Sequence, residues 1–137
     1  MNGKNIALAG LVGGAVLFVL LFGTSLLMNT FVSYGISGFG GMRAMNDPVM
    51  LLFFFYPFVV AFAQAFVFDL AKDSLKGTRV RKGLMFSAMM FIIMTIPGLF
   101  VMYTSMTWPV GFYIATLFWE VPGFLVTGAL YTKIWNI

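Results

Sequence analysis

The sequence predicts an all-α membrane protein with four transmembrane helices in an antiparallel bundle. Of the 137 residues, 61% are hydrophobic and only 9% are charged, whereas a soluble domain carries about 25% charged residues. The apolar residues form long runs, and about 20 such residues are enough for one helix to cross a bilayer. No ten-residue segments of alternating polarity, typical of transmembrane β-strands, are present.

We expect one domain over residues 1–137, with spans at about 6–28, 48–70, 84–103 and 109–133. The first span is too long for a signal peptide and lacks a small-residue cleavage site, so we interpret it as a retained helix. Gly10 and Gly14 form a Gly-x-x-x-Gly pair, which lets another helix approach closely. This pair indicates either a dimerisation face or packing within the same chain.

The second span follows a glycine-rich connector over residues 34–47. Asp47 or Asn46 before Pro48 predicts a capped helix start, because a proline fits the first turn of a helix. Pro57 near the middle of the span predicts a kink. Asp69, near the other end, is expected at the membrane interface, loosely paired with the lysines that follow it.

Five of the eight basic residues lie in the loop 72–83. Either they bind anionic lipid headgroups, or they only retain this loop on the cytoplasmic side, which is the simpler interpretation. The residues that could contact headgroups are Lys76, Arg79, Arg81 and Lys82. With four spans, both termini share this side, so the sequence predicts an inner-membrane protein with both termini cytoplasmic. The net charge of +4 does not indicate nucleic-acid binding, because the basic residues flank the membrane.

No cofactor is expected. The chain has no cysteine and no histidine, which excludes disulfides, Cys/His zinc sites and His-ligated haem. Methionine pairs at 85/89, 90/94 and 102/106 have the thioether chemistry that suits copper(I). At about 100° per residue, however, the three pairs point in different directions. Packing is therefore the favoured role of these methionines.

The fourth span carries Glu120, the one ionisable side chain in the central part of any span. A charge at this depth is costly, so it indicates a function or a partner. Helical spacing places Glu120 on one face with polar neighbours and places apolar residues on the opposite face. Trp108 and Trp135, at the two ends of the span, are expected to anchor it at the membrane interfaces. The polar face comprises Tyr113, Thr116, Glu120, Gly123, Thr127 and Tyr131, and the apolar face Ile114, Ala115, Phe118, Val121, Leu125 and Ala129.

Three states of Glu120 stay open. It is a neutral acid that hydrogen-bonds to groups such as Tyr56, Gln64 or Thr95, or an ionised acid that binds a cation in a wet cavity. In the third state it meets a basic or polar group of another protein. An internal salt bridge is excluded, because no lysine or arginine lies at that depth in the sequence.

These patterns favour a small non-enzymatic membrane protein, because no nucleophile–base pair or metal cluster can be assembled. The first interpretation is an accessory or structural subunit of a larger membrane assembly. The alternative is a small homo-oligomeric transporter or channel that uses Glu120. The expected partners are membrane lipids, together with other membrane subunits or further copies of the chain.

Overall fold

The structure is a computed structural model, and it describes residues 1–31, 43–44 and 46–137. Most of the connector predicted over residues 34–47 lies outside the described residues. The described part is helical without strands, and four of its helices are long and apolar enough to cross a membrane. The predicted fold class, a four-helix membrane bundle, is confirmed.

Two of the four crossings are built from more than one helical segment. The first crossing, α1 (Gly3–Phe31), and the fourth, α5 (Val110–Ile134), are each one continuous helix. The second consists of η2 (Pro48–Phe55), α2 (Tyr56–Ala71) and η3 (Lys72–Ser74), and the third of α3 (Arg79–Met90), η4 (Phe91–Thr95) and α4 (Ile96–Ser105).

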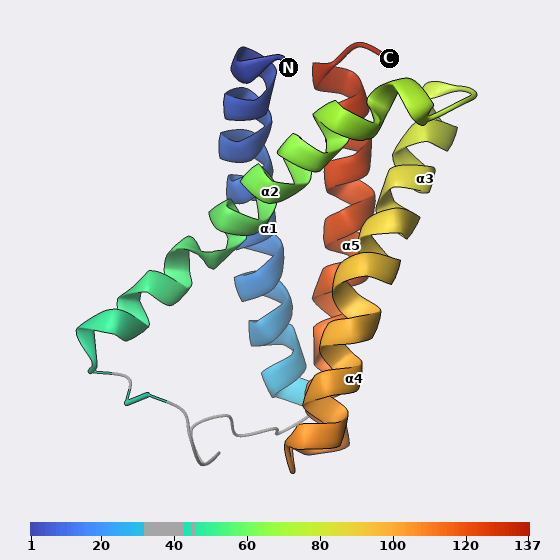
Figure 1. The fold of residues 1–137 in the computed structure, drawn as a ribbon. Coiled ribbons are helices and arrows are strands. Elements are labelled where there is room, and N and C mark those ends of the chain that lie inside the picture. Colours follow the sequence, from blue (N-terminus) through green and yellow to red (C-terminus); the bar gives the residue numbers. More distant parts are fainter. Residues whose placement is uncertain (32–42, 45) are drawn as a thin grey trace.

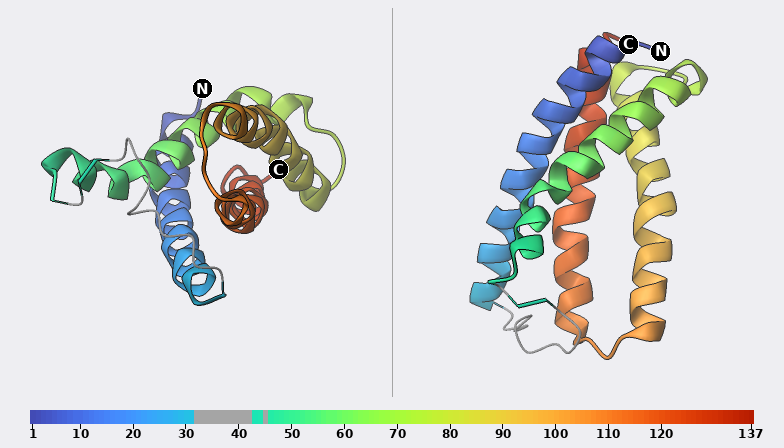
Figure 2. Two further views of the ribbon diagram at one scale, coloured as in Figure 1. Left: turned by 90° about the horizontal axis from the view of Figure 1, so that it is seen from below. Right: turned by 60° about the vertical axis from the view of Figure 1, so that its left-hand side comes forward.

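The breaks in these two crossings lie next to prolines. η2 starts as predicted, because the Asp47 carboxylate accepts a hydrogen bond of 2.8 Å from the Val49 backbone N–H. It is a 3₁₀ helix that becomes α-helical at Tyr56, beside Pro57, and the ribbon changes direction there (Figure 2). In the third crossing the Ile96 N–H donates a hydrogen bond to the Phe91 carbonyl, five residues earlier, which gives a π-helical turn just before Pro97. Such a turn accommodates a residue that breaks the regular α-helical ladder.

α5 lies between α1 and α3, and α2 packs mainly on α1 while it crosses the bundle obliquely (Figure 1). Glycines allow these close contacts. A Cβ on Gly10 would clash with the Phe62 ring, and a Cβ on Gly14 would lie 2.9 Å from the Phe58 Cα. Of the two interpretations of the Gly-x-x-x-Gly pair, the structure therefore places this face against α2 of the same chain.

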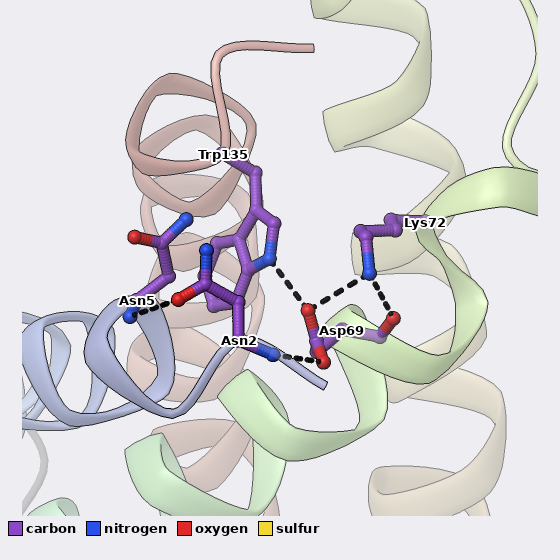
Figure 3. A network of polar contacts seen from close by, with 5 residues as sticks. All are labelled: Asn2, Asn5, Asp69, Lys72 and Trp135. Carbon is purple, nitrogen blue, oxygen red and sulfur yellow. Dashed lines mark hydrogen bonds and ion pairs between the residues drawn. The ribbon is translucent and has the colours of Figure 1, made fainter.

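The two termini and the α2–α3 loop lie at the same end of the bundle (Figure 1). At this end Asp69, only 3% exposed, accepts hydrogen bonds from three parts of the chain (Figure 3). The donors are Lys72 Nζ at 2.9 Å, Trp135 Nε1 at 2.7 Å and the Asn2 backbone N–H at 3.0 Å.

This cluster corrects two expectations. Asp69 was expected to be loosely paired, and Trp135 to anchor the helix at the membrane interface. Instead the Trp135 ring is 8% exposed and packs on Phe68 and Tyr131 inside the bundle. The sequence could not indicate this cluster, because two of the three donors, Asn2 and Trp135, lie more than 60 residues from Asp69 along the chain. Only Lys72 is a local partner.

Candidate functional site

The half of the bundle away from the termini contains a cavity of about 320 Å³. It lies between the second half of α1, the 3₁₀ helix η2, the end of α4 and the first half of α5. Glu120 and Trp119 line it from α5, and Tyr56 lines it from the start of α2. The other lining residues are Leu21, Thr24, Ser25, Met28, Phe53, Met102, Trp108, Phe112, Ala115 and Thr116.

The Glu120 carboxylate is held from the third crossing. The Thr95 hydroxyl, on the last residue of the π-helical turn, donates a hydrogen bond to Glu120 Oε2. Thr95 is 2% exposed, so this side of the carboxylate is sealed. Among the described residues no hydrogen bond is made to Oε1. One carboxylate oxygen is therefore fixed, and the other is available to a group inside the cavity.

Of the three partners considered for Glu120, the structure thus selects Thr95. Tyr56 lines the same cavity without a hydrogen bond to Glu120 among the described contacts. Gln64 lies elsewhere, where its Oε1 accepts a hydrogen bond of 2.8 Å from the Thr127 hydroxyl.

The predicted polar face of α5 divides into an open part and a sealed part. Thr116 and Glu120 line the cavity, whereas Thr127 is fully buried. Tyr113, at the outer end, donates to the Met102 carbonyl at 3.3 Å. One residue of the predicted apolar face is placed differently: Ala115 is buried and lines the cavity. Ala115 lines the cavity because the cavity wall covers more of the α5 surface than the polar face does.

The aliphatic hydroxyls of the cavity donate their protons to their own helices. Thr24 donates to the Leu20 carbonyl at 2.6 Å, Ser25 to the Leu21 carbonyl at 2.7 Å, and Thr116 to the Phe112 carbonyl at 3.0 Å. A hydroxyl has one proton but two acceptor lone pairs. The three hydroxyl oxygens can therefore only accept further hydrogen bonds, as the carboxylate does.

Aromatic rings form much of the remaining wall. Phe53 and Tyr56 stack with centroids 6.2 Å apart, and Tyr56 meets Trp119 edge to face at 6.1 Å. A second pair, Trp108 and Phe112, has centroids 4.4 Å apart. Phe112 precedes Glu120 by eight residues, which is about 12 Å along a helix. The carboxylate thus lies nearer the middle of α5, and the second aromatic pair nearer the start of this helix.

Comparisons with protein-family models, curated proteins and solved structures give no match to this chain. What the cavity can hold therefore follows from its own residues. Its described lining includes no lysine and no arginine, so Glu120 has no cationic neighbour there. In the described part of the chain, no three His, Cys, Asp or Glu residues lie close enough to hold a metal ion.

The basic residues proposed to contact lipid headgroups lie at the opposite end of the bundle from the cavity. Lys76, Arg79 and Arg81 are exposed, and Lys82 is partly buried. Arg79 donates to the Asn136 side-chain oxygen at 2.7 Å and so links the α2–α3 loop to the C-terminal residues. This group and Glu120 are therefore separate features.

Several cavity residues were missed by sequence reasoning. Thr24 and Ser25 lie seven and six residues before the end of α1 at Phe31, and hydroxyls inside a helix commonly donate to its carbonyls. Nothing in their spacing indicates which neighbouring helix they face. Trp119 is adjacent to Glu120 but lies off the predicted polar face, so helical periodicity alone excluded it.

Proposed function

We propose that the protein is a small non-enzymatic membrane carrier that binds a positively charged solute at Glu120. The observation behind this proposal is Glu120 Oε1, which accepts no hydrogen bond from a described residue and lies in a cavity whose aliphatic hydroxyl oxygens can only accept. A carboxylate that served only to join helices would be best stabilised with its oxygens satisfied by the bundle. The geometry thus favours the transporter alternative over the accessory subunit.

The accessory subunit stays as a second candidate because of η2. Leu51, Leu52 and Phe55 are each at least 60% exposed on this segment, which extends away from the rest of the bundle (Figures 1 and 2). A 3₁₀ helix of eight residues is unusually long. Contact with a partner membrane protein or a second copy of the chain would cover this surface, although lipid tails also suit it.

We further propose that the chain lies in the inner membrane with both termini cytoplasmic. Lys4, Lys133 and the loop 72–83 share the end that holds the termini. Arg43, before the start of η2, forms an ion pair of 2.9 Å with Asp47. The excess of basic residues at one end is the pattern that orients membrane proteins.

Cysteine labelling tests this orientation, and the native chain has no cysteine to interfere. Ser74, the last residue of η3, and Asn46, just before η2, are both exposed and mark the two ends of the second crossing. In intact cells an impermeant maleimide should label Asn46→Cys but not Ser74→Cys, and permeabilised cells should show both. Labelling of Ser74→Cys alone in intact cells would reverse the orientation.

The carrier function is tested by the substitution Glu120→Gln in proteoliposomes. The amide keeps the size of the side chain and its bond to Thr95 but cannot neutralise a cation. We expect the wild-type protein to give a transport current for at least one member of a panel of inorganic and organic cations. In Glu120→Gln this current should fall at least tenfold, while the melting temperature changes little.

Asp73→Asn is the matched control, because Asp73 is an exposed acid at the opposite end. Its current should equal that of the wild type. If no cation in the panel gives a current, or if Glu120→Gln carries the same current as the wild type, the carrier proposal is wrong. Dissociation of a native complex in Glu120→Gln would instead favour the accessory subunit.

A further inference from the structure

We infer that the solute is a lipophilic ammonium ion, an organic cation with apolar or aromatic substituents. This inference rests on the proposed cation site at Glu120 and specifies its ligand class. Three properties of the cavity lead to it: the volume, the arrangement of acceptor oxygens and the aromatic wall.

The volume indicates an organic ligand. A cavity of about 320 Å³ falls at the lower end of the range for small-molecule pockets, about 300–1,000 Å³. A bare metal ion would leave most of this space empty. A transmembrane helix of a partner is about 10 Å wide and would not fit inside without opening the bundle.

The oxygens of the cavity are poorly suited to a metal ion. Hard cations such as Ca²⁺ take about six to eight converging oxygen ligands, including carboxylates. Here the oxygens comprise one carboxylate and hydroxyls spread over α1, α2 and α5. A fully substituted ammonium ion needs only one opposite charge, and its large radius lowers the Born cost of leaving water. The carboxylate and aliphatic hydroxyls therefore suit a diffuse organic charge.

The aromatic wall supplies the remaining attraction. Tryptophan, tyrosine and phenylalanine rings attract a cation placed over their faces, and tryptophan does so best. Trp119 is the residue before Glu120, and its ring contacts that of Tyr56. An ammonium group beside Glu120 would therefore lie near two electron-rich rings. Its apolar substituents would extend along the cavity toward Trp108 and Phe112.

Benzyltrimethylammonium is a suitable probe, because neopentylbenzene is its neutral isostere with carbon in place of nitrogen. Binding to the protein in nanodiscs can be followed by tryptophan fluorescence, since Trp108 and Trp119 line the cavity. Protein-free nanodiscs correct for partition into lipid. We expect the wild-type protein to bind benzyltrimethylammonium at least tenfold more tightly than neopentylbenzene. Sodium chloride, added at the same ionic strength as the probe, should not displace bound benzyltrimethylammonium.

Two variants on α5 test the aromatic contribution. Trp119→Leu should weaken binding of benzyltrimethylammonium about tenfold. Phe118→Leu is the matched control, because Phe118 is adjacent but 57% exposed and outside the cavity lining. It should bind within about twofold of the wild type. Glu120→Gln should weaken binding of benzyltrimethylammonium at least tenfold. If that variant does not fold, the comparison of benzyltrimethylammonium with neopentylbenzene on the wild-type protein still tests whether the cavity selects a positive charge.

The outcomes separate this inference from the proposed function. Equal binding of the two isosteres would overturn the inference, because the cavity would then select only for apolar shape. Transport of sodium or potassium that depends on Glu120, without binding of benzyltrimethylammonium, would also overturn it but would leave the carrier proposal intact. Absence of any Glu120-dependent cation binding or transport would contradict both.

Discussion

Asp69→Ala is expected to lower the free energy of unfolding by about 3 kcal/mol. Each hydrogen bond to a buried charged group contributes about 1.5–3 kcal/mol, and the bonds to one carboxylate are not additive. The substitution removes the acceptor of Trp135 Nε1 and Asn2 N–H at once. Trp135 is 8% exposed, so its indole N–H would remain buried without a partner.

Thermal or denaturant unfolding in a mild detergent measures this effect. Asp73→Ala is the control, because Asp73 is exposed and lies four residues along the same end of the bundle; its effect should stay below about 0.5 kcal/mol. Asp69→Asn should fall between the two, since an amide oxygen still accepts from Trp135 but carries no charge. Equal stability of Asp69→Ala and Asp73→Ala would show that the cluster is not important for the fold.

The two halves of the bundle differ in how their polar groups are satisfied. At the termini end, Asp69 is bonded on both oxygens, and Tyr131 donates to the Ala61 carbonyl at 2.9 Å. At the other end, Glu120 has one bonded oxygen and faces a cavity. The Asp69 carboxylate is thus fully engaged by the fold, whereas Glu120 keeps one oxygen available to a ligand. Such an arrangement is common where binding sites need open space.

Much of the fold was predictable because its determinants are local. The apolar run lengths set the number of crossings, Asp47 and Pro48 set the start of η2, and Pro57 set the change of helix type. The π-helical turn at 91–95 was not predicted. Pro97 indicates a disturbance there, but the form of the disturbance depends on how the neighbouring helices pack.

The candidate site was predictable only in its centre. Glu120 is conspicuous because an acid deep in an apolar segment is costly, and Thr95 was among its expected partners. The rest of the cavity depends on the relative placement of helices, which no local pattern specifies. Ala115, for example, was placed on the apolar face opposite the polar one, yet it lines the cavity together with residues of several other helices.

The second large effect is expected at the contact between α1 and α2. Gly14→Leu should lower the free energy of unfolding by about 3 kcal/mol, since overpacking a close contact typically costs about 1–3 kcal/mol and occasionally more. A Cβ at this position would clash with the Phe58 ring and lie 2.9 Å from the Phe58 Cα. Because backbone cannot rotate away as a side chain can, the two helices would have to separate.

Gly23→Leu in the same helix is the matched control, because a Cβ there would meet nothing within 4 Å. It should keep the wild-type stability or raise it slightly, since leucine has a higher helix propensity than glycine. Gly10→Leu should fall between the two, because its close neighbour is the Phe62 ring, which can move. Unfolding in detergent gives the three values, and size-exclusion chromatography gives the oligomeric state. If Gly14→Leu leaves the unfolding curve unchanged but reduces the size of the assembly, the face packs against another copy of the chain and the intrachain contact is wrong.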